Sequence, residues 1–240
     1  MSEALLYAIG AAAGNVLGAL AVTRRAARSL RVIEGFVAFG AGFMLAVALV
    51  EVIPEAFVRS GGLAAGFVLL GYLLVHLSQH TVTPHFHFGE ETHQVTAVVS
   101  DSALVGLLLH TFFDGVAIAS GFLVRPSLGL LVFLAIFLHK LPEGVTVSSL
   151  ALAGGQSRSR ALANAGWLGV ATLVGVLVTE QIGLLAAHGL ALSGGVTLYV
   201  AASDLVPEFR HKPGWRLPLA FFAGAGVFYV TRAILEALLG

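Results

Sequence analysis

Long apolar segments dominate the chain, and short polar connections separate them. Each segment is too long for a β-strand and lacks the strict alternation of a half-buried strand. A helix that crosses a bilayer needs about 20 mostly apolar residues. The pattern therefore predicts an all-α integral membrane protein, one domain over residues 1–240 with a bundle of eight transmembrane helices at 4–22, 33–53, 62–79, 102–123, 127–151, 163–186, 189–207 and 217–238.

Composition narrows the class of protein further. Hydrophobic residues make up 58% of the 240 residues and charged residues 11%, whereas a soluble domain has about 25% charged residues. This composition argues against a soluble enzyme and against a disordered chain. Lys plus Arg and Asp plus Glu number 13 each, so the net charge gives no reason to expect a nucleic acid partner. The absence of Cys excludes disulfides and thiolate metal sites.

Basic residues in the connections predict the orientation in the membrane. The odd-numbered connections carry nine Lys and Arg residues, and the even-numbered ones carry two, Arg59 and Arg125. Basic residues concentrate in short cytoplasmic loops, so we expect the odd-numbered connections in the cytoplasm and both termini outside it. Ser2 and Glu3, rather than basic residues, precede the first segment, which predicts a retained helix and not a cleaved signal peptide.

The third connection, over about 80–101, differs from the others in its chemistry. It carries four His residues, Glu90 and Glu91 in the run HTVTPHFHFGEETH, with no Lys or Arg. Imidazoles and carboxylates at this density suit a loose trap for divalent metal. The alternative is a polar connector in which His is enriched by chance. The four histidines are His80, His85, His87 and His93.

Two of the predicted helices each carry a His and a carboxylate four residues apart. The fourth helix contains HTFFDG, with His110 and Asp114, and the fifth contains HKLPEG, with His139 and Glu143. This spacing puts both side chains on one helical face, and antiparallel neighbours would bring both pairs together near mid-membrane. A charge there costs about 2.5–3.5 kcal/mol and therefore indicates function. The four donors suit Zn²⁺ or another first-row divalent ion, whereas a single pair could be an ordinary interhelical hydrogen bond.

Proline residues occur within or at the end of three of the apolar segments. Pro142 has no N–H, and its ring disrupts the hydrogen bond to the carbonyl of Leu138, beside His139. Broken helical backbone is tolerated at membrane depth where it lines a polar cavity. We therefore expect the Leu138 carbonyl to face the cation path. Pro54 and Pro207 are expected to mark helix ends.

HTFFDG followed by HKLPEG resembles the paired helix-four and helix-five signatures of the ZIP (Zrt/Irt-like) metal transporters, and the chain resembles their bacterial members most. The segments AGFMLAVALVEVIPEA and YVAASDLVPEF are similar to the second and seventh helices of that family. The resemblance implies a central metal site of His110, Asp114, His139 and Glu143, with Met44 as a further ligand. It also implies a homodimer.

Many members of that family hold a second metal ion beside the first. The resemblance assigns its ligand positions to Thr111, Lys140 and Glu180 in this chain. A protonated lysine donates hydrogen bonds and cannot ligate a metal. We therefore expect Lys140 to take the place of the second metal, to pair with Asp114, Glu143 or Glu180, and to leave a mononuclear site.

Together these features predict a transporter, not an enzyme, that moves Zn²⁺ into the cytoplasm across a bacterial inner membrane. The direction is implied by the resemblance, and Fe²⁺, Mn²⁺, Co²⁺ and Cd²⁺ stay open because they share the ligand preferences of Zn²⁺. Alternating access is the favoured mechanism, although a channel-like passage would use the same residues. Glu51 on the outer side, and Asp204 and Glu208 on the inner side, are expected to line the path.

Two alternatives come from other functional classes. An intramembrane metal-dependent hydrolase would also need His and carboxylate ligands at membrane depth. Against it, the sequence has no HExxH motif, and its acidic residues extend toward both membrane faces. A sensor that binds metal without moving it would need an output surface, and the connections are short.

Overall fold

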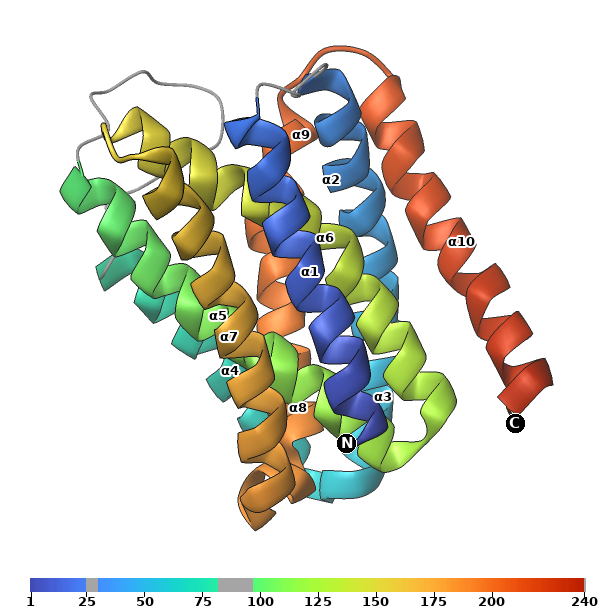
Figure 1. Ribbon diagram of the computed structural model, residues 1–240. Helices are drawn as coiled ribbons and strands as arrows, with labels where there is room; N and C mark the ends of the chain where they lie inside the picture. The colour runs from blue at the N-terminus through green and yellow to red at the C-terminus, as the bar shows by residue number, and fades with distance from the viewer. Residues whose placement is uncertain (25–29, 82–96, 240) are drawn as a thin grey trace.

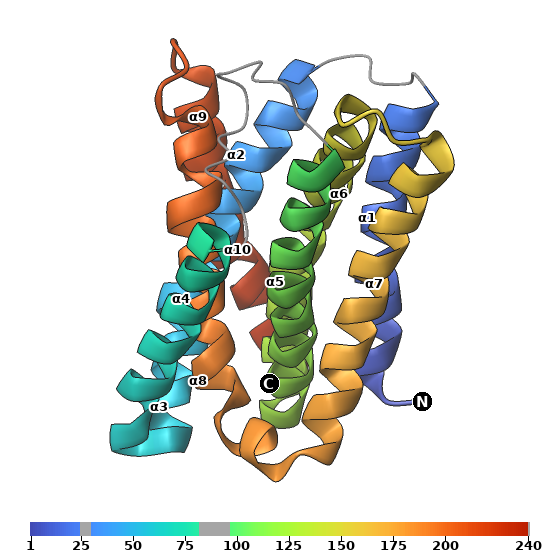
Figure 2. The same cartoon turned by 90° about the vertical axis from the view of Figure 1, so that its left-hand side faces the viewer.

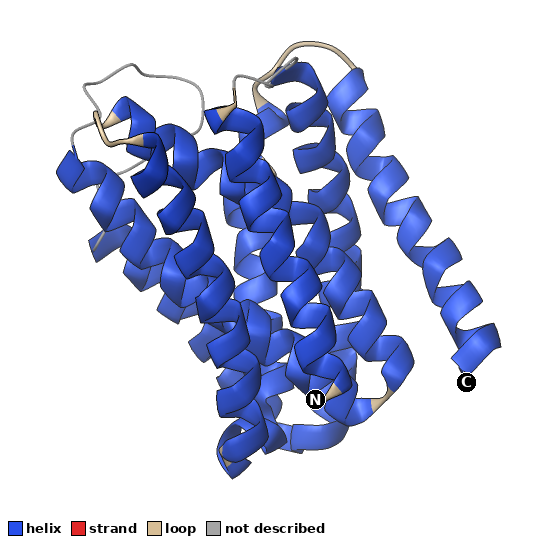
Figure 3. Cartoon of the chain, viewed as in Figure 1, coloured by secondary structure: helices blue, strands red, loops and turns tan. Residues whose placement is uncertain are grey.

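The computed structural model of the protein describes residues 1–24, 30–81 and 97–239, and no strand occurs among them (Figure 3). The prediction of an all-helical protein is confirmed. Three short segments of other helix types join the α-helices: the π-helices η1 (Val47–Val52) and η3 (Val200–Leu205), and the 3-10 turn η2 (Gly61–Leu63). The α-helices are α1 (Glu3–Thr23), α2 (Leu30–Ala46), α3 (Ile53–Ser60), α4 (Ala64–Thr81), α5 (Ala97–Val124), α6 (Pro126–Ala153), α7 (Arg158–Gln181), α8 (Gly183–Tyr199), α9 (Pro207–Arg210) and α10 (Arg216–Leu239).

Within the described residues, seven stretches are long and apolar enough to cross a membrane. One of them, Val32–Gln79, has 48 residues and contains α2, α3 and α4. The chain turns back at η2 inside this stretch (Figure 2), where Gly61 has a φ of 54°. Glycine adopts a positive φ readily because it has no Cβ. The stretch thus covers two of the helices that the sequence pattern predicts, 33–53 and 62–79.

Both termini lie at the same end of the helix bundle (Figure 1). The turns between α3 and α4, α5 and α6, and α7 and α8 lie at this end too, and we call it the terminal end. The connections from α6 to α7 and from α9 to α10 lie at the opposite end, which we call the loop end. Helices α5 and α6 run antiparallel on either side of Arg125, and each has 28 residues.

The helices continue past Pro54 and Pro207, so the expectation that these prolines mark helix ends is wrong. Each proline lies in the first turn of a further helical segment, α3 or α9, and a six-residue π-helix precedes each. In a regular α-helix a proline lacks one donor and clashes with the carbonyl four residues back. The wider i→i+5 bonding of a π-helix changes the position of that carbonyl. The helix can therefore pass through each proline.

Two other boundaries differ from the predicted ones. The predicted helix 163–186 is broken at Ile182, whose φ of −103° and ψ of 108° are those of extended chain, and α8 begins at Gly183. Helix α5 begins at Ala97 rather than at 102. The break at Ile182 lies among apolar residues on both sides, so hydropathy alone could not reveal it.

Close contacts through glycine join the long helices in four pairs, α1 with α6, α5 with α7, α2 with α10, and α4 with α8. We call α1, α5, α6 and α7 group 1, and we call α2, α3, α4, α8, α9 and α10 with the π-helices η1 and η3 group 2. Inside each group, glycines face a backbone carbonyl of the neighbouring helix so closely that a Cβ atom would collide with it. Small residues allow this close approach of membrane helices. These glycines are Gly18, Gly115, Gly144 and Gly175 in group 1, and Gly42, Gly71, Gly195 and Gly224 in group 2.

Contacts between the two groups are of a different kind. Helix α2 packs on α6 and α8 packs on α5, and the glycines there face side chains as their nearest neighbours. Gly40 of α2 lies against the side chain of Leu138, and Gly189 of α8 lies against those of Ser120 and Val116. Backbone therefore meets backbone within the four glycine-joined pairs, whereas a Cβ at Gly40 would lie 3.7 Å from the nearest backbone atom of Leu138.

Candidate metal centre

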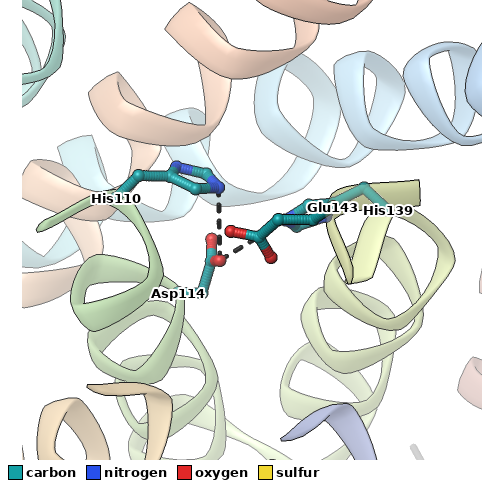
Figure 4. A group of neighbouring side chains, drawn as sticks. All are labelled: His110, Asp114, His139 and Glu143. Atoms are coloured by element: carbon teal, nitrogen blue, oxygen red, sulfur yellow. Dashed lines mark ion pairs between the residues drawn. The ribbon is translucent and has the colours of Figure 1, made fainter. Parts of the chain in front are cut away.

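The predicted ligands lie in the middle of two antiparallel helices. His110 is the fourteenth residue of α5 and His139 is the fourteenth residue of α6, with Asp114 and Glu143 four residues after them. The two pairs therefore meet halfway along α5 and α6, and Figure 4 shows the four side chains close together. One ligand atom from each of the four residues lies within 4.8 Å of the others, and all four residues are buried. The structure thus brings two imidazoles and two carboxylates to one point.

Asp114 lies between the two imidazoles. Its Oδ2 atom is 3.4 Å from Nε2 of His110 and 3.4 Å from Nε2 of His139 (Figure 4). Two ligands of a tetrahedral zinc ion, each about 2.0–2.1 Å from the metal, are about 3.4 Å apart. The spacing of these nitrogen and oxygen atoms therefore fits a shared Zn²⁺ ion.

The hydrogen bonding of His139 favours the form of the ring that binds metal. Its Nδ1 atom is 3.2 Å from the carbonyl oxygen of Ala135. In a neutral ring this contact places the proton on Nδ1 and leaves a lone pair on Nε2, as in many metal-bound histidines. Nε2 of His139 is buried and has no hydrogen-bond partner in the part of the chain that the structure describes. It is free to bind a cation.

Lys140 is fully buried and adds a positive charge to this group. Its Nζ atom is 2.6 Å from Oδ2 of Asp114 and 2.6 Å from Oε2 of Glu143. Nζ also lies 3.3 Å from Oγ1 of Thr111, and that hydroxyl donates a 2.6 Å hydrogen bond to Oε1 of Glu143. Of the three partners expected for Lys140, the structure provides Asp114 and Glu143.

Glu180, the third expected partner, lies elsewhere. It is exposed near the end of α7 and lines a cavity of about 230 Å³ with Ser2, which caps α1, and Glu3, the first residue of α1. Met44, the fifth ligand predicted for the central site, is buried in the main apolar cluster with Phe43 of α2.

Glu51 is buried in η1 between two arginines near the terminal end. One carboxylate oxygen is 2.8 Å from Nη2 of Arg125, and the other is 2.6 Å from Nε of Arg232 on α10. Nη1 of Arg125 also lies 2.9 Å from Oε2 of Glu55. Arg125 belongs to the turn between α5 and α6, so these ion pairs link group 1 to group 2. Sequence reasoning missed this link because it joins distant parts of the chain.

The inner acidic residues lie toward the loop end. Asp204 of η3 accepts a 2.7 Å hydrogen bond from Nε2 of Gln79, whose Oε1 accepts a 3.1 Å hydrogen bond from Tyr199. Glu208 is partly buried in α9. The metal trap predicted in the third connection depends on His80, His85, His87 and His93. The side chain of His80 and the whole of the other three residues lie outside the described part of the chain.

Comparisons with known proteins agree with this arrangement. The family model of the ZIP zinc transporters matches residues 90–232, which include both His–carboxylate motifs. Zinc transporter GufA of Myxococcus xanthus is 34% identical over 193 residues, 73% of each chain. Zinc transporter ZIP9-A of Xenopus laevis is 31% identical over 165 residues, 61% of this chain and 54% of that protein. The chain thus spans about half the length of the Xenopus relative. On these matches and on its apolar helices, the chain is a membrane protein that belongs to the ZIP zinc transporter family.

Proposed function

We propose that this chain carries a divalent cation of the zinc type across a membrane, through the buried site formed by His110, Asp114, His139 and Glu143. The observation that carries the proposal is the meeting of these four side chains, within 4.8 Å, at the middle of α5 and α6. A conducting site must bind the ion well enough to admit it and weakly enough to release it. Nitrogen and oxygen ligands without any thiolate suit that requirement. The relatives GufA and ZIP9-A, which bear the name zinc transporter, support zinc as the substrate.

We further propose eight membrane crossings within a single transport domain. The reversal at Gly61 supports counting α2 with α3 as one crossing and α4 as the next. The connections at the loop end are flanked by the basic residues Arg158, Arg210 and Lys212, as expected for cytoplasmic loops. The termini then lie outside the cytoplasm, and transport toward the loop end delivers metal into it. The Myxococcus relative supports a bacterial inner membrane, and the resemblance to the family is the basis for a homodimer.

The placement of the site supports alternating access by movement of one helix group against the other. All four ligands belong to group 1, whereas Glu51 and Asp204, at opposite ends of the proposed path, belong to group 2. Movement of group 1 against group 2 would carry the intact ligand set from one acidic residue toward the other. Backbone contacts inside each group would be kept, and side-chain contacts between the groups would change.

The direct test is zinc uptake into liposomes that contain the purified chain and a trapped zinc-sensitive dye. We expect uptake well above that of empty liposomes and no hydrolysis of peptide or ester substrates. Uptake should also fall at lower pH, because imidazoles must be unprotonated to bind metal. Zinc binding without any uptake would contradict the proposal and favour a sensor. The hydrolase alternative has no support from the comparisons, since the matched family consists of transporters.

A Lys140→Asp variant is expected to bind two zinc ions per chain, whereas the unaltered chain binds one. The buried Nζ lies 2.6 Å from each of two carboxylates, so Lys140 balances charge there as a second cation would. Replacing it by a carboxylate supplies a ligand and removes the competing positive charge. Equilibrium dialysis followed by elemental analysis counts the ions. Lys212→Asp, which alters the lysine paired with Glu34, is the control; one ion in both variants would reject this role for Lys140.

A further inference from the structure

Asn15 is a polar residue inside an apolar helix, and its side chain is completely buried. Its own backbone carbonyl faces Gly144 of α6 so closely that a Cβ atom there would collide with it. At the preceding residue, Gly14, a Cβ atom would lie 3.1 Å from Cβ of Lys140. Backbone packing between α1 and α6 therefore holds the Asn15 amide beside Glu143 and Lys140.

Hydrogen-bond chemistry sets the orientation of this amide. The two groups that face it are the backbone carbonyl oxygen of Lys140 and Oε2 of Glu143, and both are acceptors. An amide oxygen pointed at them would make no hydrogen bond, whereas the amide nitrogen has two donors to give. With the nitrogen facing the site, Asn15 donates to the Lys140 carbonyl at 2.6 Å and to Oε2 of Glu143 at 3.1 Å.

The donors around Glu143 divide its two carboxylate oxygens into different roles. Oε2 accepts from Nζ of Lys140 at 2.6 Å and from Asn15 at 3.1 Å, and Oε1 accepts from Thr111 at 2.6 Å. Each carboxylate oxygen has about two lone-pair sites. Both sites of Oε2 are therefore occupied, and Oε1 keeps one site for a cation.

We propose that Asn15 is a positioning residue that holds Oε2 of Glu143 and thereby presents Oε1 to the transported cation. This inference rests on the proposed function. Lys140 shares its ammonium between Asp114 and Glu143, whereas Asn15 is anchored at once to the carboxylate and to the backbone of the same helix. Groups that orient a metal ligand in this way typically change metal affinity by about 10–100-fold when removed.

The test is a calorimetric titration of Zn²⁺ into the purified full-length chain. An Asn15→Leu variant keeps the branching and the number of heavy atoms of the side chain and removes both donors, so we expect its Kd for Zn²⁺ to rise by about 10–100-fold. The matched control is Asn164→Leu on α7. Asn164 is also buried, 2% exposed, and its Nδ2 atom has no hydrogen-bond partner among the described residues. We expect its Kd to equal that of the unaltered chain.

A double-mutant cycle separates positioning from a purely structural role. In a Glu143→Gln background, Asn15→Leu should change the Kd by no more than about 2-fold, since the group through which Asn15 acts has been altered. The same fold-change in both backgrounds would overturn the proposal. Should Asn15→Leu fail to fold, Asn15→Ala, which is smaller and also removes both donors, replaces it in the cycle with the same expected outcomes. If the unaltered chain binds zinc and Asn15→Leu binds it equally well, only the role of Asn15 is rejected. If the unaltered chain binds no zinc, the proposed function itself is rejected.

Discussion

Zinc uptake into liposomes is expected to fall to the level of empty liposomes in a His139→Ala variant. The substitution removes an imidazole whose Nε2 atom faces the centre of the site, 3.4 Å from Asp114. Loss of a group that only orients a ligand weakens metal binding by about 10–100-fold. Loss of the ligand itself should weaken zinc binding by more than this. Uptake measured with the trapped dye, together with a zinc titration in detergent, checks the expectation. Thermal unfolding of the same sample shows whether the variant is folded.

His188→Ala provides the matched control for this experiment. His188 lies near the terminal end, stacked on Phe67 with ring centroids 4.5 Å apart and hydrogen-bonded to Ser60 at 2.9 Å. It takes no part in the group of four side chains. Its loss should leave uptake near that of the unaltered chain. Full uptake by a folded His139→Ala variant would remove the central site from the mechanism.

A Gly144→Ala variant is expected to lose both thermal stability and zinc affinity. A Cβ atom at this position collides with the backbone carbonyl of Asn15, and no rotamer change can relieve a clash with backbone. Helix α1 must therefore shift from α6, and overpacking of this kind costs about 1–3 kcal/mol. Glu143 is the adjacent residue, so the same shift disturbs a ligand. Thermal unfolding and a zinc titration measure the two losses.

Gly226→Ala is the control that separates this effect from the general consequence of a methyl group. Gly226 lies on α10, and a Cβ there would meet nothing within 4 Å. Because alanine favours a helix by about 1 kcal/mol over glycine, this variant should be as stable as the unaltered chain or slightly more so. Equal melting temperatures for the two variants would show that close packing at Gly144 is unimportant.

The sequence was sufficient to locate the candidate site because the relevant spacing is local. A His and a carboxylate four residues apart must share a helical face, and a short connection makes consecutive helices antiparallel. Those two facts place His110, Asp114, His139 and Glu143 together without knowledge of any other helix. The same reasoning limited the partners of Lys140 to three carboxylates, of which the structure provides Asp114 and Glu143.

Features that depend on packing between distant segments were beyond sequence reasoning. Asn15 reaches Glu143 because α1 lies against Gly144, a contact between helices far apart in the chain. Glu180 was expected near Lys140 by resemblance, yet it lines a cavity with the start of α1. The two π-helices were also not predicted from the sequence. The prolines in long apolar segments, Pro54 and Pro207, were a usable signal for an irregular helix.

The ion pairs of Arg125 have a consequence for the electrostatics of the terminal end. Under alternating access, any opening there separates Arg125 in one helix group from Glu51 and Glu55 in the other. Arg232 stays with Glu51 because both belong to group 2. The group 2 side of such an opening would carry Glu51, Glu55 and Glu236 against Arg232 alone, a net negative charge facing an approaching cation, and closing would return Arg125 to Glu51 and Glu55. The same movement that admits the ion would thus also set the local field that attracts it.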